Sequence, residues 1–382
     1  MAEVDRPLTV DHHSAGPILA LVTGFPRLLA RGLARRILNE HPESRVHLLH
    51  APEELEGAQA FRDALDAVAA RRVSLVAGRT LDTDLGLAGP EINRLLESVT
   101  HVFHAATVQS GARAALHRQN LDATGRLLDL CLEMQRLRRF CFFSTAFVSG
   151  NRAGVIREED LDCGQSFRTV YESTMARAER MLRDQMARTP ITVLRPASMI
   201  GHSRTGEPES LDDGPNYLVR LLVRLPAEVP LVLPGTGFVP LNIVPIDYVV
   251  RAACVLACKP EAESRTFHLT DPNPLSARQA FEILSELANR PAPFAGQVAA
   301  RFIRSVMKLP GVDRVVPQQY ALMENLNTHV VYDCAGTLEL LADTDIFCPP
   351  FESYADQLVA WVARYERENR AAPAPAAQAM TP

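Results

Sequence analysis

The chain has 382 residues, of which 47% are hydrophobic, and a formal net charge of −5. This length can bury a large α/β core, and the mildly acidic balance gives no reason to expect a nucleic-acid partner. The seven cysteines form no CxxC pair and no Cys/His metal spacing, which is typical of reduced core thiols in a cytoplasmic protein. No apolar run approaches the ~20 residues of a transmembrane helix, and the early acidic residues do not fit a signal peptide.

Apolar runs alternate with amphipathic stretches through the first half of the chain. The pattern predicts strands at 17–24, 45–50, 72–78, 100–106, 138–145 and 191–196, and helices at 28–38, 53–70, 114–134 and 171–188. The wholly apolar run 17–24 is typical of a central strand that is buried on both faces. Strands that alternate with helices predict right-handed crossovers and a Rossmann-type, doubly wound parallel sheet in the α/β class.

The pattern loosens after residue 200, where loops rich in Gly, Pro and Glu separate short elements. We therefore expect a smaller substrate-covering region at 201–370, partly interleaved with a cofactor-binding-like domain at 17–200. Residues 1–16 form an N-terminal extension, and the Ala/Pro-rich tail 371–382 is expected to be disordered. Two basic amphipathic stretches, 216–225 and 298–309, fit packed helices with solvated arginines better than contact with a membrane or an acyl carrier.

Short motifs follow one another in a fixed order along the first 270 residues. They are "TGFPRLLA" at 23–30, "GRTLDTDLGL" at 78–87, "HAA" at 104–106, "FFSTAFVSG" at 142–150, "LRPASMIGHSRTGE" at 194–207, "NIVPIDYV" at 242–249 and "FHLT" at 267–270. In this order they resemble the extended short-chain dehydrogenase/reductase family of the NAD-dependent epimerase/dehydratase superfamily. The closest resemblance is to the thioester-reductase and fatty-acyl-reductase branch. It implies a Rossmann-type fold, NADP or NAD as cofactor, and an acyl-thioester or derived carbonyl substrate, free or carrier-bound.

The cofactor turn departs from this family's T-G-x-x-G-x-x-G pattern. Gly24 is kept, whereas Arg27 stands at the middle glycine and Ala30 at the last one. The glycines let the backbone approach a pyrophosphate at a helix N-terminus, so the Arg27 side chain grows where that group would lie. A guanidinium can also pair with phosphate, so both obstruction and binding by Arg27 stay open.

The adenosine side of the expected cofactor site has also changed. By the resemblance, His50 replaces an arginine that pairs with the 2′-phosphate of NADP, and Arg79 replaces an aspartate beside the adenine. The second change turns a hydrogen-bond acceptor into a charged donor. The remaining cofactor-binding positions that the resemblance implies are Leu28, Ala105, Ala106 and Pro196.

The catalytic positions are partly kept. The resemblance implies that Thr145 holds a substrate carbonyl oxygen, that Tyr171 supplies a proton, and that Asn120 has a structural and catalytic role. The family's lysine, four residues after the tyrosine, is Met175. A lone tyrosine has a pKa near ~10, and a cation about 4 Å away contributes on the order of 4 kcal/mol at an effective dielectric of about 20. Met175 contributes none of this. For Thr145, Tyr171 and Asn120, a packing role is the alternative.

Two functions are compatible with this pattern. In the first, which we favour, the fold is kept and nicotinamide redox chemistry is weakened or lost, leaving a binding protein or a non-redox acid/base catalyst on an acyl or carbonyl substrate. In the second, the protein is an active NAD(P)H-dependent reductase or dehydrogenase of an acyl thioester or a derived carbonyl compound. The resemblance further implies a homodimer through the helices at 114–134 and 171–188.

Overall fold

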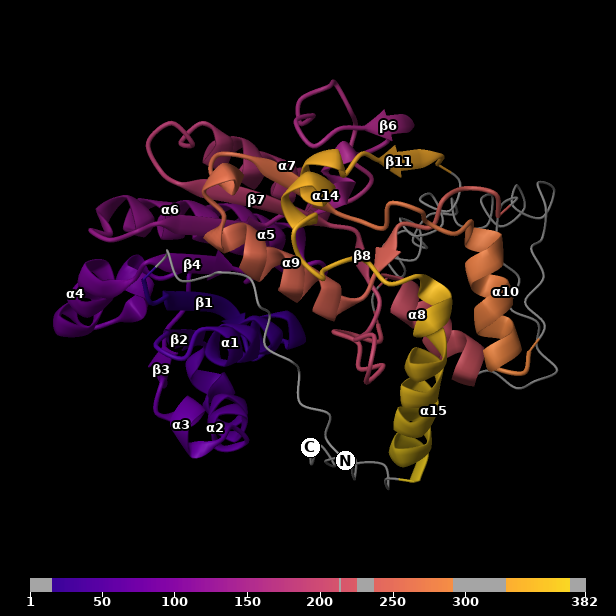
Figure 1. Ribbon diagram of the computed structural model, residues 1–382, viewed down its shortest axis with the longest axis horizontal. Helices are drawn as coiled ribbons and strands as arrows, with labels where there is room; N and C mark the ends of the chain where they lie inside the picture. Colours follow the sequence, from indigo (N-terminus) through magenta and orange to yellow (C-terminus); the bar gives the residue numbers. More distant parts are fainter. Residues whose placement is uncertain (1–15, 213, 225–236, 291–327, 372–382) are drawn as a thin grey trace, which may run out of the picture.

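The computed structural model describes residues 16–212, 214–224, 237–290 and 328–371 (Figure 1). Residues 1–15 of the expected N-terminal extension, the tail beyond residue 371 and the amphipathic stretch 298–309 lie outside these ranges. Within them, no helix has the length and apolar character needed to cross a membrane. The same ranges contain no cluster of three side chains able to hold a metal ion.

A seven-stranded sheet, in which every neighbouring pair is parallel, forms the centre of the molecule. Its order is β10-β7-β5-β4-β1-β2-β3, so the chain reverses direction across the sheet between β1 and β4. This confirms the doubly wound parallel sheet. β10 comes from the "FHLT" motif, which the alternation of strands and helices did not predict as a strand. The strands are β1 (Leu19–Phe25), β2 (Arg45–His50), β3 (Val73–Ala77), β4 (His101–His104), β5 (Arg139–Phe143), β7 (Ile191–Pro196) and β10 (Thr266–Leu269).

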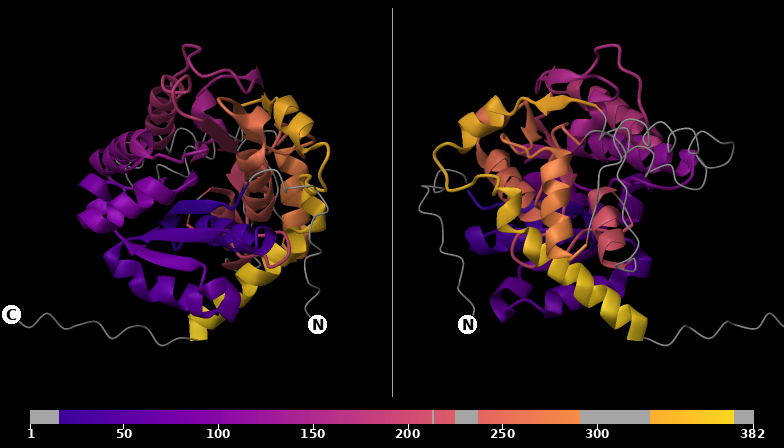
Figure 2. Two further views of the ribbon diagram at one scale, coloured as in Figure 1. Left: turned by 60° about the vertical axis from the view of Figure 1, so that its left-hand side comes forward. Right: turned by 90° about the vertical axis from the view of Figure 1, so that its right-hand side faces the viewer.

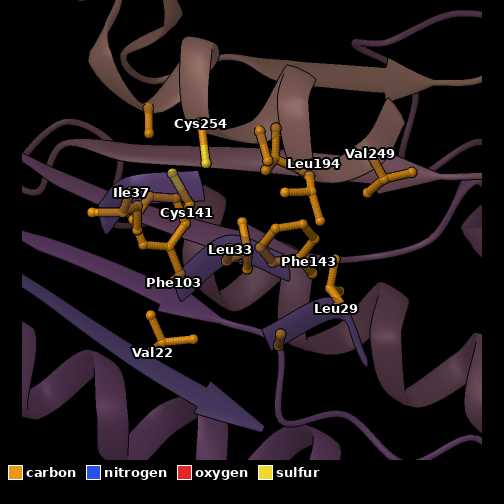
Figure 3. Close-up of a cluster of buried hydrophobic side chains, with 14 of the residues drawn as sticks. Val22, Leu29, Leu33, Ile37, Phe103, Cys141, Phe143, Leu194, Val249 and Cys254 are labelled. Atoms are coloured by element: carbon orange, nitrogen blue, oxygen red, sulfur yellow. The ribbon is translucent and has the colours of Figure 1, made fainter. Parts of the chain in front are cut away.

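Helices α1 (Leu28–Glu40) and α9 (Ile246–Cys258) cover one face of the sheet. In α1 the apolar residues recur at intervals of four, so one stripe of the helix faces the strands. Each fully buried aliphatic or aromatic side chain of this kind contributes about 1.5–3 kcal/mol to folding. Figure 3 shows the resulting cluster between the two layers, with labelled residues Val22, Leu29, Leu33, Ile37, Phe103, Cys141, Phe143, Leu194, Val249 and Cys254.

The opposite face is covered by α4 (Gly89–Ser98), α6 (Ala123–Glu133) and α7 (Val170–Arg183). The helix expected at 114–134 is α5 (Arg113–His117) joined to α6 through the π-helical turn η4 (Arg118–Asp122). α4 was not predicted, and the helix expected at 171–188 already ends at Arg183.

The single helix expected at 53–70 is wrong. The segment divides into η2 (Pro52–Glu54), α2 (Leu55–Asp63) and α3 (Ala67–Ala70). Asp66 causes the break, because its carboxylate accepts hydrogen bonds of 2.8 and 2.9 Å from the amides of Val68 and Ala69. It thereby caps a new helix N-terminus inside the expected one.

A separate apolar cluster lies to one side of the sheet, where α8 (Gly214–Arg224), α10 (Ala277–Leu287) and α15 (Ala355–Ala371) pack together (Figures 1 and 2). The boundary at residue 200 stays a prediction, because β10 lies beyond it in sequence and is an edge strand of the central sheet. Two short parallel pairs join distant segments, β8 with β9 and β6 with β11. The remaining elements are η3 (Thr83–Gly86), η5 (Ala146–Ser149), β6 (Gly154–Ile156), β8 (Ser198–Met199), β9 (Ile243–Val244), η6 (Pro260–Ala262), β11 (Val330–Tyr332), α14 (Ala335–Leu341) and η7 (Phe351–Ser353).

Candidate functional site

A cavity of about 380 Å³ opens at the carboxyl ends of the central strands. Gly24 of β1 and Ala105 after β4 form part of its wall, so it lies where the strand order reverses. Ligands of open α/β sheets bind at this switch point. Thr145 follows β5, Pro196 ends β7, and Tyr171 reaches the cavity from α7.

The predicted site residues divide into two groups around this cavity. Those in its wall are Gly24, Arg27, Ala105, Thr145, Tyr171 and Pro196. The others do not line the cavity, and they are Leu28, His50, Arg79, Ala106, Asn120 and Met175. The cavity also has wall residues that the sequence did not point to, of which Thr107 and Glu209 matter most for its chemistry.

The start of α7 fixes the position of Tyr171. Thr169 is the N-cap residue, and its hydroxyl oxygen accepts a 3.1 Å hydrogen bond from the amide of Glu172. The Glu172 carboxylate in turn accepts a 2.8 Å hydrogen bond from the amide of Arg168. These two bonds hold the first turn of the helix, and with it the tyrosine, at the cavity edge.

The phenol of Tyr171 lines the cavity together with the side chains of Thr145 and Thr107. Burial raises the pKa of Tyr171 to about 12, although the two neighbouring hydroxyls and the charge of Arg27 act in the opposite direction. The phenol is therefore neutral near pH 7 and can donate its proton. Thr145 is itself fixed, because its hydroxyl caps η5 by accepting a 3.3 Å hydrogen bond from the amide of Phe147.

Arg27 crosses from the β1–α1 turn to the loop after β4. Its Nη1 donates a 2.5 Å hydrogen bond to the carbonyl oxygen of Thr107. The two segments lie close because Gly24 has a φ of +81° and a Cβ added there would stand 2.6 Å from the carbonyl oxygen of Ala105. Only glycine fits this contact. The guanidinium thus lies beside the loop whose Thr107 lines the cavity together with Tyr171.

The N-terminus of α1 already holds an anion from the protein itself. One carboxylate oxygen of Glu209 accepts a 3.2 Å hydrogen bond from the amide of Leu28, and the other accepts a 2.9 Å bond from the amide of Leu29. Free amides and the helix dipole make such an N-terminus an anion site, which dinucleotide-binding folds use for pyrophosphate. Burial raises the pKa of Glu209, against the effects of the two amides and of Arg27 and Arg31.

The loop that carries Glu209 has a defined path. The Ser203 amide and hydroxyl donate hydrogen bonds of 2.7 and 2.6 Å to the carboxylate of Asp247. Gly206 has a φ of +72°, and a Cβ there would overlap the carbonyl oxygen of Gln357 in α15. The loop is therefore held on one side by α9 and on the other by α15. The "TGE" motif ends two residues before Glu209, and nothing in the sequence pattern distinguishes this carboxylate from its acidic neighbours.

Met175 lies one helical turn after Tyr171 but outside the cavity wall. Its side chain is 0% exposed and belongs to the apolar cluster beneath α7, together with Leu127 and Phe142. The position that carries a lysine in the family pattern is here part of the hydrophobic core and brings no charge to Tyr171.

Asn120 has a structural function in the π-helical turn. Its Oδ1 accepts a 2.7 Å hydrogen bond from the amide of Val108, and its Nδ2 donates to the carbonyl oxygen of Val108 at 2.8 Å. A third bond, of 3.1 Å, goes from Nδ2 to the hydroxyl of Thr174. The fully buried amide therefore connects the loop that carries Thr107 to α7.

The two changed adenosine positions are engaged with their own surroundings. His50 is 1% exposed, and its Nδ1 hydrogen-bonds to the carbonyl oxygen of Ala51 at 2.9 Å. Arg79 forms an exposed ion pair of 2.5 Å with Glu53. Its positive charge is thus partly compensated by the protein itself.

A buried ion pair connects the helix and the strands that carry the site residues. Glu179 of α7 and Arg195 of β7 are both fully buried and pair at 2.6 Å. The Glu179 carboxylate also accepts a 2.7 Å hydrogen bond from Ser144, the neighbour of Thr145. The pair thereby links α7 to the ends of β5 and β7, the three elements that carry Tyr171, Thr145 and Pro196.

The family model described as "Male sterility protein", an NAD-binding family, matches residues 22–253. The chain belongs to this family. The motifs, the sheet and this match together confirm an extended short-chain dehydrogenase/reductase fold of the thioester-reductase and acyl-reductase type.

Among curated proteins, the chain is 24% identical over 359 residues to a linear gramicidin synthase of Brevibacillus parabrevis, covering 87% of this chain and 7% of that protein. It is 24% identical over 289 residues to "Aldehyde reductase lnaA" of Aspergillus flavus, covering 71% of this chain and 26% of that protein. The chain spans less than half the length of these curated relatives.

Among solved structures, the chain is similar to the terminal R domain from the myxalamid PKS-NRPS biosynthetic pathway, with a TM-score of 0.75, 21% identity and 92% of each chain covered. It is also similar to UDP-glucuronic acid 4-epimerase from Bacillus cereus in complex with NAD. That match has a TM-score of 0.68 and 16% identity, and it covers 93% of this chain and 99% of the other. At these identities the likeness establishes the shared fold.

Proposed function

We propose that this protein binds an acyl or carbonyl compound, free or as a carrier-bound thioester, and that its nicotinamide redox chemistry is weakened or lost. One observation carries the proposal: the Glu209 carboxylate occupies the amides of Leu28 and Leu29, where a dinucleotide would place its pyrophosphate. The site then retains a proton donor and a carbonyl-binding pair without a strong cofactor anchor.

The energetic argument concerns competition between two anions. Hydrogen bonds to a charged group contribute about 1.5–3 kcal/mol each, and a pyrophosphate must displace two of them before it gains the same amides. If Glu209 stays nearby, its negative charge also repels the incoming phosphates. The Arg27 side chain and the engaged residues His50 and Arg79 add to this cost at other points of the expected cofactor path.

The substrate side supports a non-redox acid/base function. Thr145 and the neutral Tyr171 both line the cavity, so a carbonyl oxygen placed between them would accept a hydrogen bond from each hydroxyl. Such contacts polarise a carbonyl, and the phenol can pass a proton to it. The reductase and peptide-synthetase names of the relatives favour an acyl thioester as the compound bound.

A titration of the full chain tests the proposal. We expect millimolar NADPH or NADH to leave the melting temperature of the wild-type protein and the fluorescence of the cofactor unchanged. In Glu209→Ala we expect the cofactor to raise the melting temperature, because a ligand at concentration [L] stabilises the folded state by RT ln(1 + [L]/Kd). Glu207→Ala is the matched control, because Glu207 lies in the same loop and pairs with the Arg31 side chain instead. Micromolar cofactor binding by the wild-type protein would contradict the proposal.

The alternative is an active NAD(P)H-dependent reductase of the same substrates. The neighbouring hydroxyls of Thr145 and Tyr171 and the reductase relatives favour it. It requires turnover of an acyl-coenzyme A or aldehyde with NADPH, measured at 340 nm, and loss of that turnover in Tyr171→Phe. An acyl-thioester that stabilises the protein with no cofactor present and is never reduced would decide for the first function.

A further inference from the structure

Arg27 is the cation in the wall of the cavity that Tyr171 lines. Both residues line the same cavity together with Thr107, whose carbonyl oxygen accepts the hydrogen bond of the guanidinium and whose side chain acts on the phenol. We propose that Arg27 takes the place of the family's missing lysine and provides, from the β1–α1 turn, the positive charge that favours the ionised form of Tyr171. The proposal rests on the placement of Tyr171 at the reacting site under the proposed function.

Among the charged groups around the phenol, Arg27 is the one that favours the ionised form of Tyr171. On its own helix, the buried Glu172 disfavours ionisation of Tyr171. From the loop after β8, Glu209 lines the same cavity. Arg27 is the cation that lowers the pKa of Tyr171, against the larger effect of burial. The lysine position itself, Met175, is neutral and buried.

The geometry also fixes where this charge lies. The 2.5 Å bond to Thr107 orients the guanidinium toward the loop that lines the cavity together with Tyr171. Arg27 forms no ion pair within 4.0 Å in the part of the chain that the structure describes, so its charge is not neutralised by direct contact. An arginine stays charged at every pH at which the protein is folded. Because the side chain is exposed, solvent screens its effect below that of a buried lysine.

This assignment joins two departures from the family pattern. Arg27 occupies the middle glycine position of the cofactor turn, and Met175 removes the lysine. A cation moved from α7 to the cofactor turn favours ionisation of the same tyrosine and, at the same time, fills space that a pyrophosphate would use. Together, the two substitutions move one positive charge from the position of Met175 in α7 to that of Arg27 in the β1–α1 turn.

Site-specific replacement of Tyr171 by 3,5-difluorotyrosine in the full chain tests the proposal. Fluorine makes the phenol more acidic, so it titrates where the protein stays folded, and ¹⁹F NMR follows this one residue. We expect Arg27→Met to raise the titration midpoint by about one pH unit, and Arg27→Lys to keep most of the wild-type value. Arg31→Met is the matched control. Arg31 lies in the first turn of the same helix, pairs with Glu207 and does not line the cavity. Removing this cation should therefore leave the titration midpoint of Tyr171 unchanged.

Identical midpoints in the wild-type protein and Arg27→Met would overturn the proposal. An equal shift in Arg31→Met would overturn it too, because the effect would then come from overall charge. Arg27→Gln provides a second neutral variant in case Arg27→Met disturbs the fold, which circular dichroism reports. The titration uses neither cofactor nor substrate, so its outcome is separate from the binding tests of the proposed function.

Discussion

Glu209 and Leu29 lie 180 residues apart in the sequence, and the structure joins them through a 2.9 Å hydrogen bond between carboxylate and amide. The amide belongs to the first turn of α1, and the carboxylate comes from a loop that follows the "TGE" motif. A position that usually accepts a ligand anion is thus satisfied inside the protein.

The pH dependence of cofactor affinity reports on this contact. Burial raises the pKa of Glu209, so the carboxyl is protonated at a higher pH than an exposed glutamate and then loses the charge that holds the α1 amides. A pyrophosphate remains ionised over the same range. We expect NADP⁺ binding by the wild-type protein, too weak to detect near neutral pH, to become stronger as the pH falls and Glu209 is protonated. Calorimetric titrations at several pH values measure it, and Glu209→Ala should bind more tightly with a flatter profile. Parallel profiles for the two proteins would refute this linkage.

Restoring the lysine by a single substitution should fail. Met175 is 0% exposed in an apolar cluster, so Met175→Lys buries an ammonium group, and we expect a loss of about 3 kcal/mol or more in the free energy of unfolding. Met175→Leu keeps the volume and should cost less than about 1.5 kcal/mol. Urea denaturation measures both. A stable Met175→Lys protein that binds NADPH would show that this side chain can reach the cavity.

Asn120 offers a test of the loop that carries Thr107. Asn120→Ala removes three hydrogen bonds and leaves the backbone groups of Val108 without their partner, so we expect a loss of about 2–3 kcal/mol in the free energy of unfolding. Gln119→Ala is the control, because this neighbour makes one long bond of 3.4 Å to a carbonyl oxygen and should cost less than about 0.5 kcal/mol. Equal effects would mean that Asn120 does not hold the loop.

Acid should destabilise the protein through buried histidines. His104 lies between the hydroxyls of Thr23 and Thr124, and burial lowers its pKa to about 3. The unfolded chain binds a proton below about pH 6.5 and the folded protein does not, so stability falls as the pH drops from about 6.5 toward about 3. This one group contributes about 1.4 kcal/mol per pH unit. In His104→Asn, the dependence of the unfolding free energy on pH, measured by urea denaturation at several pH values, should be less steep by that amount.

The fold followed from the sequence because strands such as β1 and β5 lie in largely apolar runs and helices such as α1 have one apolar stripe. What the pattern missed had local causes. Asp66 interrupts an amphipathic stretch that has the periodicity of one helix, and α4 begins at a Gly-Pro pair that resembles a loop. β10 is four residues long and follows a break in the alternation, so only its place beside β7 identifies it as a strand.

The candidate site was predictable where it depends on local motifs. Tyr171, Thr145 and Gly24 each stand at the end of a recognisable strand or helix, and the structure brings them to one cavity. Glu209 could not be found this way, because its contact with α1 joins a loop to a helix N-terminus that is 180 residues away in the sequence. The reach of Arg27 to Thr107 likewise depends on a turn and a loop that are 80 residues apart.

Gly206 has no room for a side chain because the backbone of α15 passes directly over it. Helix α15 therefore packs against the loop that carries Glu209, whose carboxylate accepts hydrogen bonds from the α1 amides, and limits how far this loop can move. Substitutions on the inner face of α15 that shift this helix by a fraction of an ångström would alter how firmly Glu209 is seated, without touching the cavity. Selection on this remote surface can thus adjust anion affinity at the opposite end of the chain.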